Sequence, residues 1–308
     1  MAGPKTIDPE LVISHQFPEG DFTYSERDVV LYALGVGACS GNAVDEKELK
    51  YVYHNLGQPF VKVLPTFAVL FPFQLVNQLM RLPGLQFNPA LLLHGQQYLE
   101  ICKPLPTSCN VRNEAVVAGL HDKGKAAVIE IETTSYDRES GEALCKNRST
   151  LYLRGAGGFS KSSSMYTYSR NAAKMNFSTG FPDTPPFAIH EESTQSSQAL
   201  LYRLSGDYNP LHSDPVVANI AGFSRPILHG LCTLGFAVRA VIKCCCHGEP
   251  NMVKSLMGRF LLHVYPGETL ITEMWLEQER VVYRTMVKER SQAVFSGFVV
   301  LNRLPSAM

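Results

Sequence analysis

The sequence has no excess of charge of either sign. Its 308 residues contain 28 lysines and arginines and 28 aspartates and glutamates, so the formal net charge at pH 7 is zero. A nucleic-acid-binding protein usually carries a clustered basic face, and a solvating acidic tail would shift the balance the other way. The composition therefore argues against a nucleic acid as partner.

Long hydrophobic runs are also missing. The longest uncharged run, Val63 to Met80, barely reaches the length of a membrane span and contains Pro65, Pro72 and Asn77. We therefore expect a buried helix in this run and no membrane insertion. Residues 1–10 hold no apolar segment of the kind that a secretory signal peptide requires, so we expect no such signal.

Cysteine is scarce, with eight residues in the whole chain. Three of these, Cys244, Cys245 and Cys246, are consecutive, which suits no ordinary disulfide framework. Adjacent residues on a helix also cannot converge on one metal ion, so a buried helix end is the favoured interpretation of this run. We expect a reducing, intracellular environment.

Hydrophobic residues make up 45% of the chain, and its length fits two ordinary domains or one large one. Residues 155–186 are rich in Gly, Ser, Asn and Pro, a composition that gives turns and irregular backbone. We predict that this segment is a linker between an N-terminal domain, residues 1–154, and a C-terminal domain, residues 187–308.

The two parts resemble diverged copies of each other. Residues 31–40 read LYALGVGACS and residues 201–210 read LYRLSGDYNP, which share Leu-Tyr-x-Leu. Gly95, with Pro104 after it, is matched in the same order by Gly258, with Pro266 after it. Each match is weak alone, but together they favour an internal duplication.

Each copy contains a long apolar helix pattern, Thr66 to Leu82 in the first and Gly230 to about Lys243 in the second. Alternating runs rich in Val, Ile, Thr and Tyr follow each helix and predict antiparallel strands. These strand-like runs are residues 96–102, 110–120, 125–137, 150–155, 258–265, 269–277, 280–289 and 293–302. We predict an α+β fold in which each sheet wraps around a long central helix.

The densest cluster of reactive side chains is residues 205–214, SGDYNPLHSD. Gly206 would end the preceding helix, and Pro210 excludes helical angles at Asn209, so Asp207 to His212 should form a defined loop. A carboxylate and an imidazole held in one loop can move a proton through a bound water near neutral pH. The same residues also suit a simple turn, and the spacing alone leaves both interpretations open. We expect no metal, because no second His or Cys lies nearby at ligand spacing.

Leu228-His229-Gly230 opens the second long helix. The free backbone N–H groups at a helix start can stabilise a developing oxyanion, and Gly230 would let a substrate carbonyl approach closely. The triplet alone favours the simpler interpretation, an irregular helix start.

The stretch Tyr202 to Phe223, YRLSGDYNPLHSDPVVANIAGF, with the following PILHGLCTLG, resembles the motif of the R-specific 2-enoyl-CoA hydratase 2 family, within the MaoC-like hot-dog superfamily. The resemblance covers essentially the whole chain and extends to the hydratase part of peroxisomal multifunctional enzymes. It implies a double hot-dog fold, in agreement with the duplication. It also implies reversible hydration of a trans-2-enoyl-CoA to a (3R)-3-hydroxyacyl-CoA in peroxisomal fatty-acid beta-oxidation, with no cofactor.

The resemblance also assigns roles to residues. It makes Asp207 and His212 the catalytic acid–base pair, with Asn209 fixing the water and Gly230 holding the thioester oxygen. The positions that it implies for the acyl-CoA site are His94, Gly95, Lys123, Asp207, Tyr208, Asn209, Pro210, Leu211, His212, Gly230 and Phe260. The first copy has Gly37 and Cys39 where Asp207 and Asn209 stand, so we expect it to shape the acyl-tail and CoA pocket without a catalytic pair.

Three other functions stay open because one fold serves many activities. They are a hot-dog acyl-CoA thioesterase, an acyl-ACP dehydratase and a non-catalytic acyl-CoA binder, although a binder would not need Asp207 and His212. The resemblance further implies an acyl-CoA thioester as substrate, a homodimer and a peroxisomal location. The C-terminal Ser306-Ala307-Met308 is at best a degenerate peroxisomal signal.

Overall fold

The computed structural model describes residues 7–54, 60–170, 181–277 and 279–302. The α-helices are α1 (Pro9–Ile13), α2 (Glu26–Gly35), α3 (Glu46–Leu49), α4 (Phe73–Val76), α5 (Gln198–Tyr202), α6 (Pro215–Ile220) and α7 (Gly230–Cys245). The 3-10 helices are η1 (Pro65–Leu70), η2 (Asn77–Arg81), η3 (Pro89–Leu91), η5 (Arg203–Ser205), η6 (Pro210–His212) and η7 (Pro250–Met252).

Eleven strands form one antiparallel sheet. They are β1 (Gly20–Tyr24), β2 (Leu92–Ile101), β3 (Cys109–Asp122), β4 (Ala126–Asp137), β5 (Ala143–Arg154), β6 (Thr167–Ser169), β7 (Ala188–Ser193), β8 (Val253–Phe260), β9 (Thr269–Glu277), β10 (Arg280–Val287) and β11 (Gln292–Leu301). Their order is β1-β3-β4-β5-β2-β8-β11-β10-β9-β7, with β6 attached to β3.

The strand order is symmetric about its centre. The strands of the N-terminal half, β1, β3, β4, β5 and β2, correspond in turn to β7, β9, β10, β11 and β8 of the C-terminal half. β2 and β8 are counterparts and pair with each other at the centre, from Gln96 opposite Arg259 to Glu100 opposite Ser255. The shared Leu-Tyr-x-Leu segments also meet, because the rings of Tyr32 in α2 and Tyr202 in α5 lie 6.0 Å apart. The two copies therefore form one continuous sheet, and an approximate two-fold axis between β2 and β8 relates them.

The alternation of burial explains the strands. In β4, Ile129, Ile131, Thr133 and Ser135 are buried at every second position, as a sheet with one covered face requires. The strand predicted over residues 258–265 begins and ends earlier in the structure, as β8 over Val253–Phe260. Leu261 and Leu262 lie outside the sheet and are exposed. The burial of β8 does not alternate, because neighbouring residues on its two faces, Leu256 and Met257, are both buried in apolar clusters.

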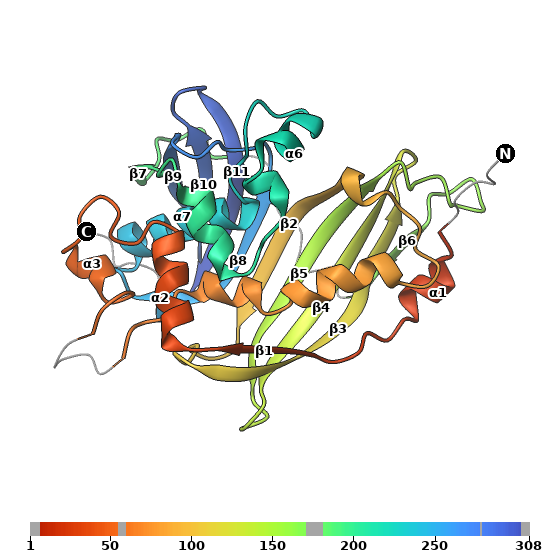
Figure 1. Cartoon of the computed structure of the whole chain (residues 1–308), viewed down its shortest axis with the longest axis horizontal. Coiled ribbons are helices and arrows are strands. Elements are labelled where there is room, and N and C mark those ends of the chain that lie inside the picture. The colour runs from red at the N-terminus through yellow and green to blue at the C-terminus, as the bar shows by residue number, and fades with distance from the viewer. Residues whose placement is uncertain (1–6, 55–59, 171–180, 278, 303–308) are drawn as a thin grey trace.

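The long helix expected in each copy exists only in the C-terminal half. There α7 runs as 16 continuous residues across strands β8–β11, and most of its side chains are buried (Figure 1). In the N-terminal half the segment from Thr66 to Leu82 is broken into η1, α4 and η2, which cross strands β2–β5. Pro72 lies at the break, because its ring removes a backbone donor and clashes with the preceding turn.

The expected linker is not irregular throughout. Ala156 and Phe159 are buried in the apolar core of the N-terminal half, and residues 167–169 form β6 on the edge of β3. The Asp122 carboxylate at the end of β3 holds the segment in place. It accepts hydrogen bonds from the N–H groups of Gly158 and Ser160, each at 2.8 Å, and from the Ser160 hydroxyl at 2.7 Å. Residues 171–180 of the expected linker lie outside the described part of the chain.

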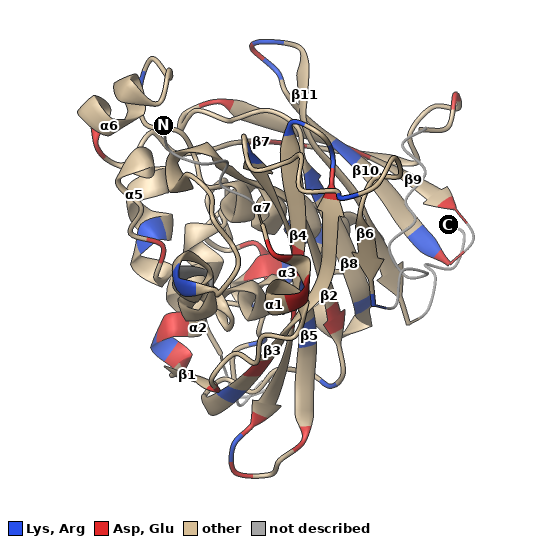
Figure 2. Cartoon of the chain, turned by 90° about the vertical axis from the view of Figure 1, so that its right-hand side faces the viewer, with Lys and Arg blue, Asp and Glu red and all other residues tan. Residues whose placement is uncertain are grey.

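In the described ranges no helix combines the length and the apolar character needed to cross a membrane. The eight cysteines carry free thiols, and Cys245 and Cys246 are buried at the end of α7. Lysines and arginines alternate with aspartates and glutamates over the elements visible in Figure 2.

Candidate active site

The loop 206–212 is fixed by local signals at both ends. Gly206 has φ of 121° after η5, a conformation that favours glycine, and Pro210 begins η6. The Asn209 side-chain oxygen accepts the Leu211 N–H at 3.0 Å and so caps that short helix. Asp214 caps α6 by accepting the Val216 N–H at 2.8 Å. These contacts support the predicted loop between two helical segments.

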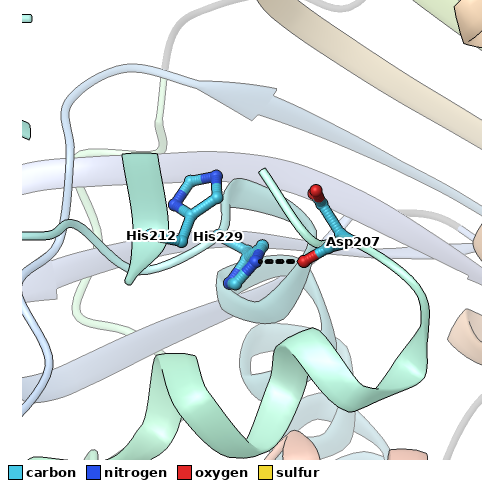
Figure 3. Close-up of side chains that lie close together, drawn as sticks. All are labelled: Asp207, His212 and His229. Carbon is cyan, nitrogen blue, oxygen red and sulfur yellow. Dashed lines mark hydrogen bonds between the residues drawn. The ribbon is translucent and has the colours of Figure 1, made fainter. Parts of the chain in front are cut away.

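The loop brings Asp207 and His212 together, and His229 joins them from the start of α7 (Figure 3). One side-chain oxygen or nitrogen atom of each residue lies within 4.8 Å of those of the other two. The Asp207 carboxylate accepts the Asn209 N–H at 3.2 Å. The His212 Nδ1 lies 2.8 Å from the Ile227 carbonyl oxygen. Because a carbonyl only accepts, His212 carries its proton on Nδ1 and keeps the Nε2 lone pair free.

The surroundings shift the two pKa values in opposite directions. Burial raises the pKa of the Asp207 carboxyl, although His212 and the Asn209 N–H oppose this shift. Burial lowers the pKa of the His212 imidazole, against the opposing effects of the Ile227 carbonyl and Asp207. A neutral imidazole and a protonated carboxyl are both favoured by these shifts. Neighbouring groups whose pKa values are both shifted by burial are typical of acid–base sites.

His229 was not among the expected site residues. It lies 17 positions after His212, at no motif spacing, and only the fold brings its ring to 3.8 Å from the His212 ring. The sequence spacing around the loop did not reveal this second histidine, because only the fold brings it to the pair. Each ring already directs one nitrogen to a backbone carbonyl, His212 to that of Ile227 and His229 to that of Asp207, so each could offer an ion only its other nitrogen. The geometry favours acid–base chemistry over metal binding.

Gly230, His94, Gly95 and Phe260 gather beside this group. Gly230 is the first residue of α7, and the preceding His229 side chain makes no capping hydrogen bond. The Cys232 and Thr233 N–H groups donate to the His229 carbonyl oxygen, so within the described ranges the Gly230 N–H is the group at this helix start that we consider for a ligand. The Phe260 ring lies against Gly230, because a Cβ added to Gly230 would be 2.8 Å from the Phe260 Cε1 atom. The centroids of the Phe260 and His94 rings are 4.9 Å apart.

Close packing against Tyr152 explains the glycine at position 95. It is the extra residue of a bulge in β2, between His94 and Gln96. An added Cβ would lie 2.4 Å from the Tyr152 ring on β5, so only glycine fits. Burial lowers the pKa of His94 to about 4, which keeps this imidazole neutral.

Of the remaining expected residues, Tyr208, Pro210 and Leu211 belong to the loop of the pair, and Lys123 lies elsewhere. Tyr208 is 56% exposed, with the Arg203 guanidinium 4.8 Å from its ring centroid, and Pro210 is also exposed. Leu211 follows Pro210 and is partly buried. Lys123 occupies the turn between β3 and β4, where its N–H bonds the Ala126 carbonyl at 2.9 Å. Within the described ranges no contact joins Lys123 to the pair.

In the N-terminal half, side chains of α7 occupy the space beside the corresponding loop. An added Cβ on Gly37 would lie 2.4 Å from the Phe236 ring, and the Cys39 N–H donates to Glu48. Arg239 of α7 is buried there and forms ion pairs with Glu48 and Glu192. The first copy therefore holds a buried ion-pair cluster where the second holds the Asp207–His212 pair.

The chain matches two known domain families. Residues 22–155 match the MFE-2 hydratase 2 N-terminal domain, and residues 178–296 match the MaoC-like domain. The fold is similar to that of a conserved Mycobacterium tuberculosis protein described as a double hotdog, with a TM-score of 0.55 at 13% identity over 92% of this chain and 94% of the other. The expected double hot-dog fold is thereby confirmed, and it defines a protein of the MaoC-like class.

Two further similarities identify the family. The chain is 56% identical over 299 residues, 97% of each sequence, to "Enoyl-CoA hydratase 2, peroxisomal" from Arabidopsis thaliana. It also superimposes with a TM-score of 0.77 at 37% identity on the full-length peroxisomal multifunctional enzyme type 2 from Drosophila melanogaster, covering 92% of this chain and 48% of that one. The chain belongs to the enoyl-CoA hydratase 2 family.

Proposed function

We propose that the protein catalyses the reversible addition of water to a trans-2-enoyl-CoA, giving the (3R)-3-hydroxyacyl-CoA. The observation that carries the proposal is the Asp207–His212 pair, held by one loop beside the start of α7. The membership of the chain in the enoyl-CoA hydratase 2 family supports the same reaction.

The pair supplies both proton transfers that hydration needs. The free Nε2 of His212 accepts a proton from water as the oxygen bonds to C3 of the enoyl group. An Asp207 carboxyl that carries a proton, the form that its burial favours, delivers that proton to C2. The water thus gives a hydroxyl to C3, and the pair returns to its starting charge after the proton moves from His212 to Asp207. Dehydration follows the same steps in reverse, with the two roles exchanged.

The start of α7 stabilises the charge that develops during the addition. When oxygen attacks C3, electron density moves through C2 onto the thioester oxygen, which becomes enolate-like. The Gly230 N–H donates to this oxygen, and the glycine leaves room for its close approach. Gly230 and the pair are linked directly, because His229 precedes Gly230 and bonds the Asp207 carbonyl oxygen.

The substrate crosses both halves of the chain in this proposal. His94 and Gly95 of β2 and Phe260 of β8 line the reacting end, together with residues 207–212. The break at Pro72 leaves the N-terminal half without a continuous central helix, and we assign the acyl tail to that side. We assign Lys123 to the CoA end of the substrate, where its positive charge would bind a phosphate. Residues 1–154 and 187–308 remain the proposed domains.

The activity test uses the purified full chain with crotonyl-CoA and trans-2-decenoyl-CoA. We expect loss of the enoyl absorbance without release of free thiol, and chiral analysis of the product should give the 3R alcohol. Release of CoA thiol would establish a thioesterase instead. Binding without any conversion would indicate an acyl-CoA carrier, and a 3S product would contradict the proposed geometry.

We also propose a peroxisomal location in fatty-acid beta-oxidation, supported by the name of the Arabidopsis relative. Ser306-Ala307-Met308 lies outside the described residues. A fluorescent protein fused to the N-terminus should enter peroxisomes, and deleting the last three residues tests whether they carry the signal. The proposed homodimer is tested by light scattering during size-exclusion chromatography, where a monomeric mass would overturn it.

A further inference from the structure

His229 is the most enclosed ionisable side chain of the site. It is 1% exposed, and its ring is held between two others, His212 at 3.8 Å and Tyr202 at 4.9 Å. Its Nε2 lies 3.1 Å from the backbone carbonyl oxygen of Asp207. One side chain thus touches both members of the proposed acid–base pair, through the ring of His212 and the main chain of Asp207 (Figure 3).

These contacts determine where the His229 proton resides. The Asp207 carbonyl only accepts, so Nε2 carries the proton and donates it. The other nitrogen, Nδ1, is buried and has no hydrogen-bond partner among the described residues. A second proton on Nδ1 would therefore be a buried charge without a partner. Burial, together with the neighbouring His212 and Arg203, lowers the pKa of His229 to about 3.

We propose that His229 is a positioning residue that holds the Asp207–His212 pair in its working state. Its N–H fixes the main chain of Asp207, and its neutral ring covers one face of His212 and keeps water from it. This role rests on the hydratase function proposed above, and no part of the reaction passes through His229 itself.

The charges around the two rings favour this arrangement. Asp207 is the carboxylate nearest His212, and the Ile227 carbonyl accepts from its Nδ1. On the side of His229, the charged neighbour is the Arg203 guanidinium of η5, which disfavours a second positive charge. Without the His229 ring, water would reach His212 and favour its protonated form, in which Nε2 cannot accept a proton.

Two substitutions separate the two contacts. His229→Phe keeps an aromatic ring against His212 but removes the N–H that Asp207 accepts. Its ring also lacks the unpartnered nitrogen, so little stability should be lost on that side. His229→Gln keeps a side-chain N–H donor but removes the ring. Tyr202→Phe is the matched control, because it keeps a ring against His229 and removes a buried hydroxyl that has no partner among the described residues.

The measurements are kcat, KM and the pH profile of kcat/KM with crotonyl-CoA, at temperatures where each variant is folded by circular dichroism. We expect His229→Phe to lower kcat about tenfold with KM nearly unchanged, since the lost hydrogen bond orients Asp207 and does not bind substrate. We expect His229→Gln to move the acidic limb to higher pH by about half a unit or more, because solvent raises the pKa of His212. Tyr202→Phe should leave both quantities unchanged.

Several outcomes would overturn the inference. An unchanged acidic limb in His229→Gln together with an unchanged kcat in His229→Phe would make His229 an ordinary packing residue. The same conclusion follows if each variant loses activity only in proportion to its folded fraction. If the wild-type protein converts no enoyl-CoA, the proposed hydratase function is wrong. The role of His229 is then judged by the NMR titration described next and not by the kinetic comparison.

A measurement on the unmodified full chain decides the role independently of activity and of variant folding. Nitrogen-15 NMR of the histidine rings, titrated from pH 8 to pH 4.5, should show His229 neutral throughout with its proton on Nε2. A proton on Nδ1, or protonation of His229 near the ordinary histidine value, would overturn the inference even for a fully active enzyme.

Discussion

Asp207 and His212 belong to one short loop, yet burial moves their pKa values in opposite directions. Burial disfavours the charged form of each group, and that form is the deprotonated one for a carboxyl and the protonated one for an imidazole. A single environment therefore prepares one acid and one base. This is the property that a reaction with two proton transfers requires.

Removing either proton-transfer group should stop the reaction without unfolding the protein. We expect Asp207→Asn and His212→Gln each to lower kcat by about 10² or more. Both residues are partly exposed in a loop, so the free energy of unfolding should change little. Steady-state kinetics with crotonyl-CoA and urea titration of each variant check this prediction. Turnover close to that of the wild type in a folded variant would remove the acid–base assignment.

Gly230 offers a test of the proposed oxyanion contact. An alanine Cβ at this position would lie 2.8 Å from the Phe260 ring, so the ring must move toward or away from the substrate site. We expect Gly230→Ala to lower kcat/KM at least about tenfold and Gly230→Val to lower it further. Gly267→Ala, at a turn with space around it, is the control for stability alone, since its φ of 93° strains any side chain. Equal losses of activity in both variants would contradict a role at the site.

Among the elements, the two central segments show how one repeated pattern gives two structures. α7 is a continuous buried helix, whereas the corresponding segment of the N-terminal half breaks at Pro72 into η1, α4 and η2. The apolar residues of η1 remain in the main core, so burial is kept while the helix is lost. In the proposed function, this break is the difference that assigns the acyl tail to the N-terminal half.

The segment after β5 depends on one buried carboxylate. Burial opposes the charge on Asp122, but the hydrogen bonds from Gly158, Ser160 and Gly124 outweigh it and lower its pKa to about 2. We expect Asp122→Ala to reduce the free energy of unfolding by about 3 kcal/mol at pH 7, because several hydrogen bonds to a charged group are lost. Asp137→Ala, at an exposed turn, is the control and should cost much less.

The pH dependence of this effect has a defined sign. A carboxyl whose pKa is lowered in the folded state contributes stability above its unfolded pKa of about 4 and loses it as the pH falls through about 2. The difference between wild type and Asp122→Ala should therefore shrink between about pH 4 and pH 2. A difference that stays constant across this range, measured by urea unfolding, would show that folding does not lower the pKa of Asp122.

At the scale of the whole molecule, the central pairing of β2 with β8 joins the two halves into one sheet. The same junction builds the site, because His94 of β2 packs against Phe260 of β8, which lies against Gly230. The second half carries the Asp207–His212 pair that we propose to be catalytic, while the equivalent place beside the first half is occupied by the ion pairs of Arg239 with Glu48 and Glu192. One chain should therefore contain one active site.

The isolated C-terminal half should consequently be inactive. Residues 187–308 contain Asp207, His212 and Gly230 but would expose the edge of β8 and lack His94. We expect this fragment to show less than about 1% of the turnover of the full chain, and to self-associate through the exposed strand edge. Turnover assays and size-exclusion chromatography check both expectations. Full activity of a monomeric fragment would contradict a site built from both halves.

The sequence alone predicted the features that depend on short stretches of chain. Alternation of apolar residues indicated the strands, and Gly206 and Pro210 indicated the loop that holds Asp207 and His212. These signals act over a few residues, because backbone angles and burial at alternate positions are set locally. The motif around the loop also sufficed to indicate the family, since it lies in one continuous stretch.

Only the tertiary structure decided which distant residues meet. His229 is 17 positions from His212 and carries no spacing signal, yet packing stacks the two rings. The segment 155–170 has the composition of a linker, but Asp122 holds part of it against the sheet through hydrogen bonds. Likewise, an apolar helix pattern could not show that the N-terminal central segment breaks and still fills the core. These outcomes depend on contacts between elements far apart in the chain, whose energies exceed the local preferences that a sequence reveals.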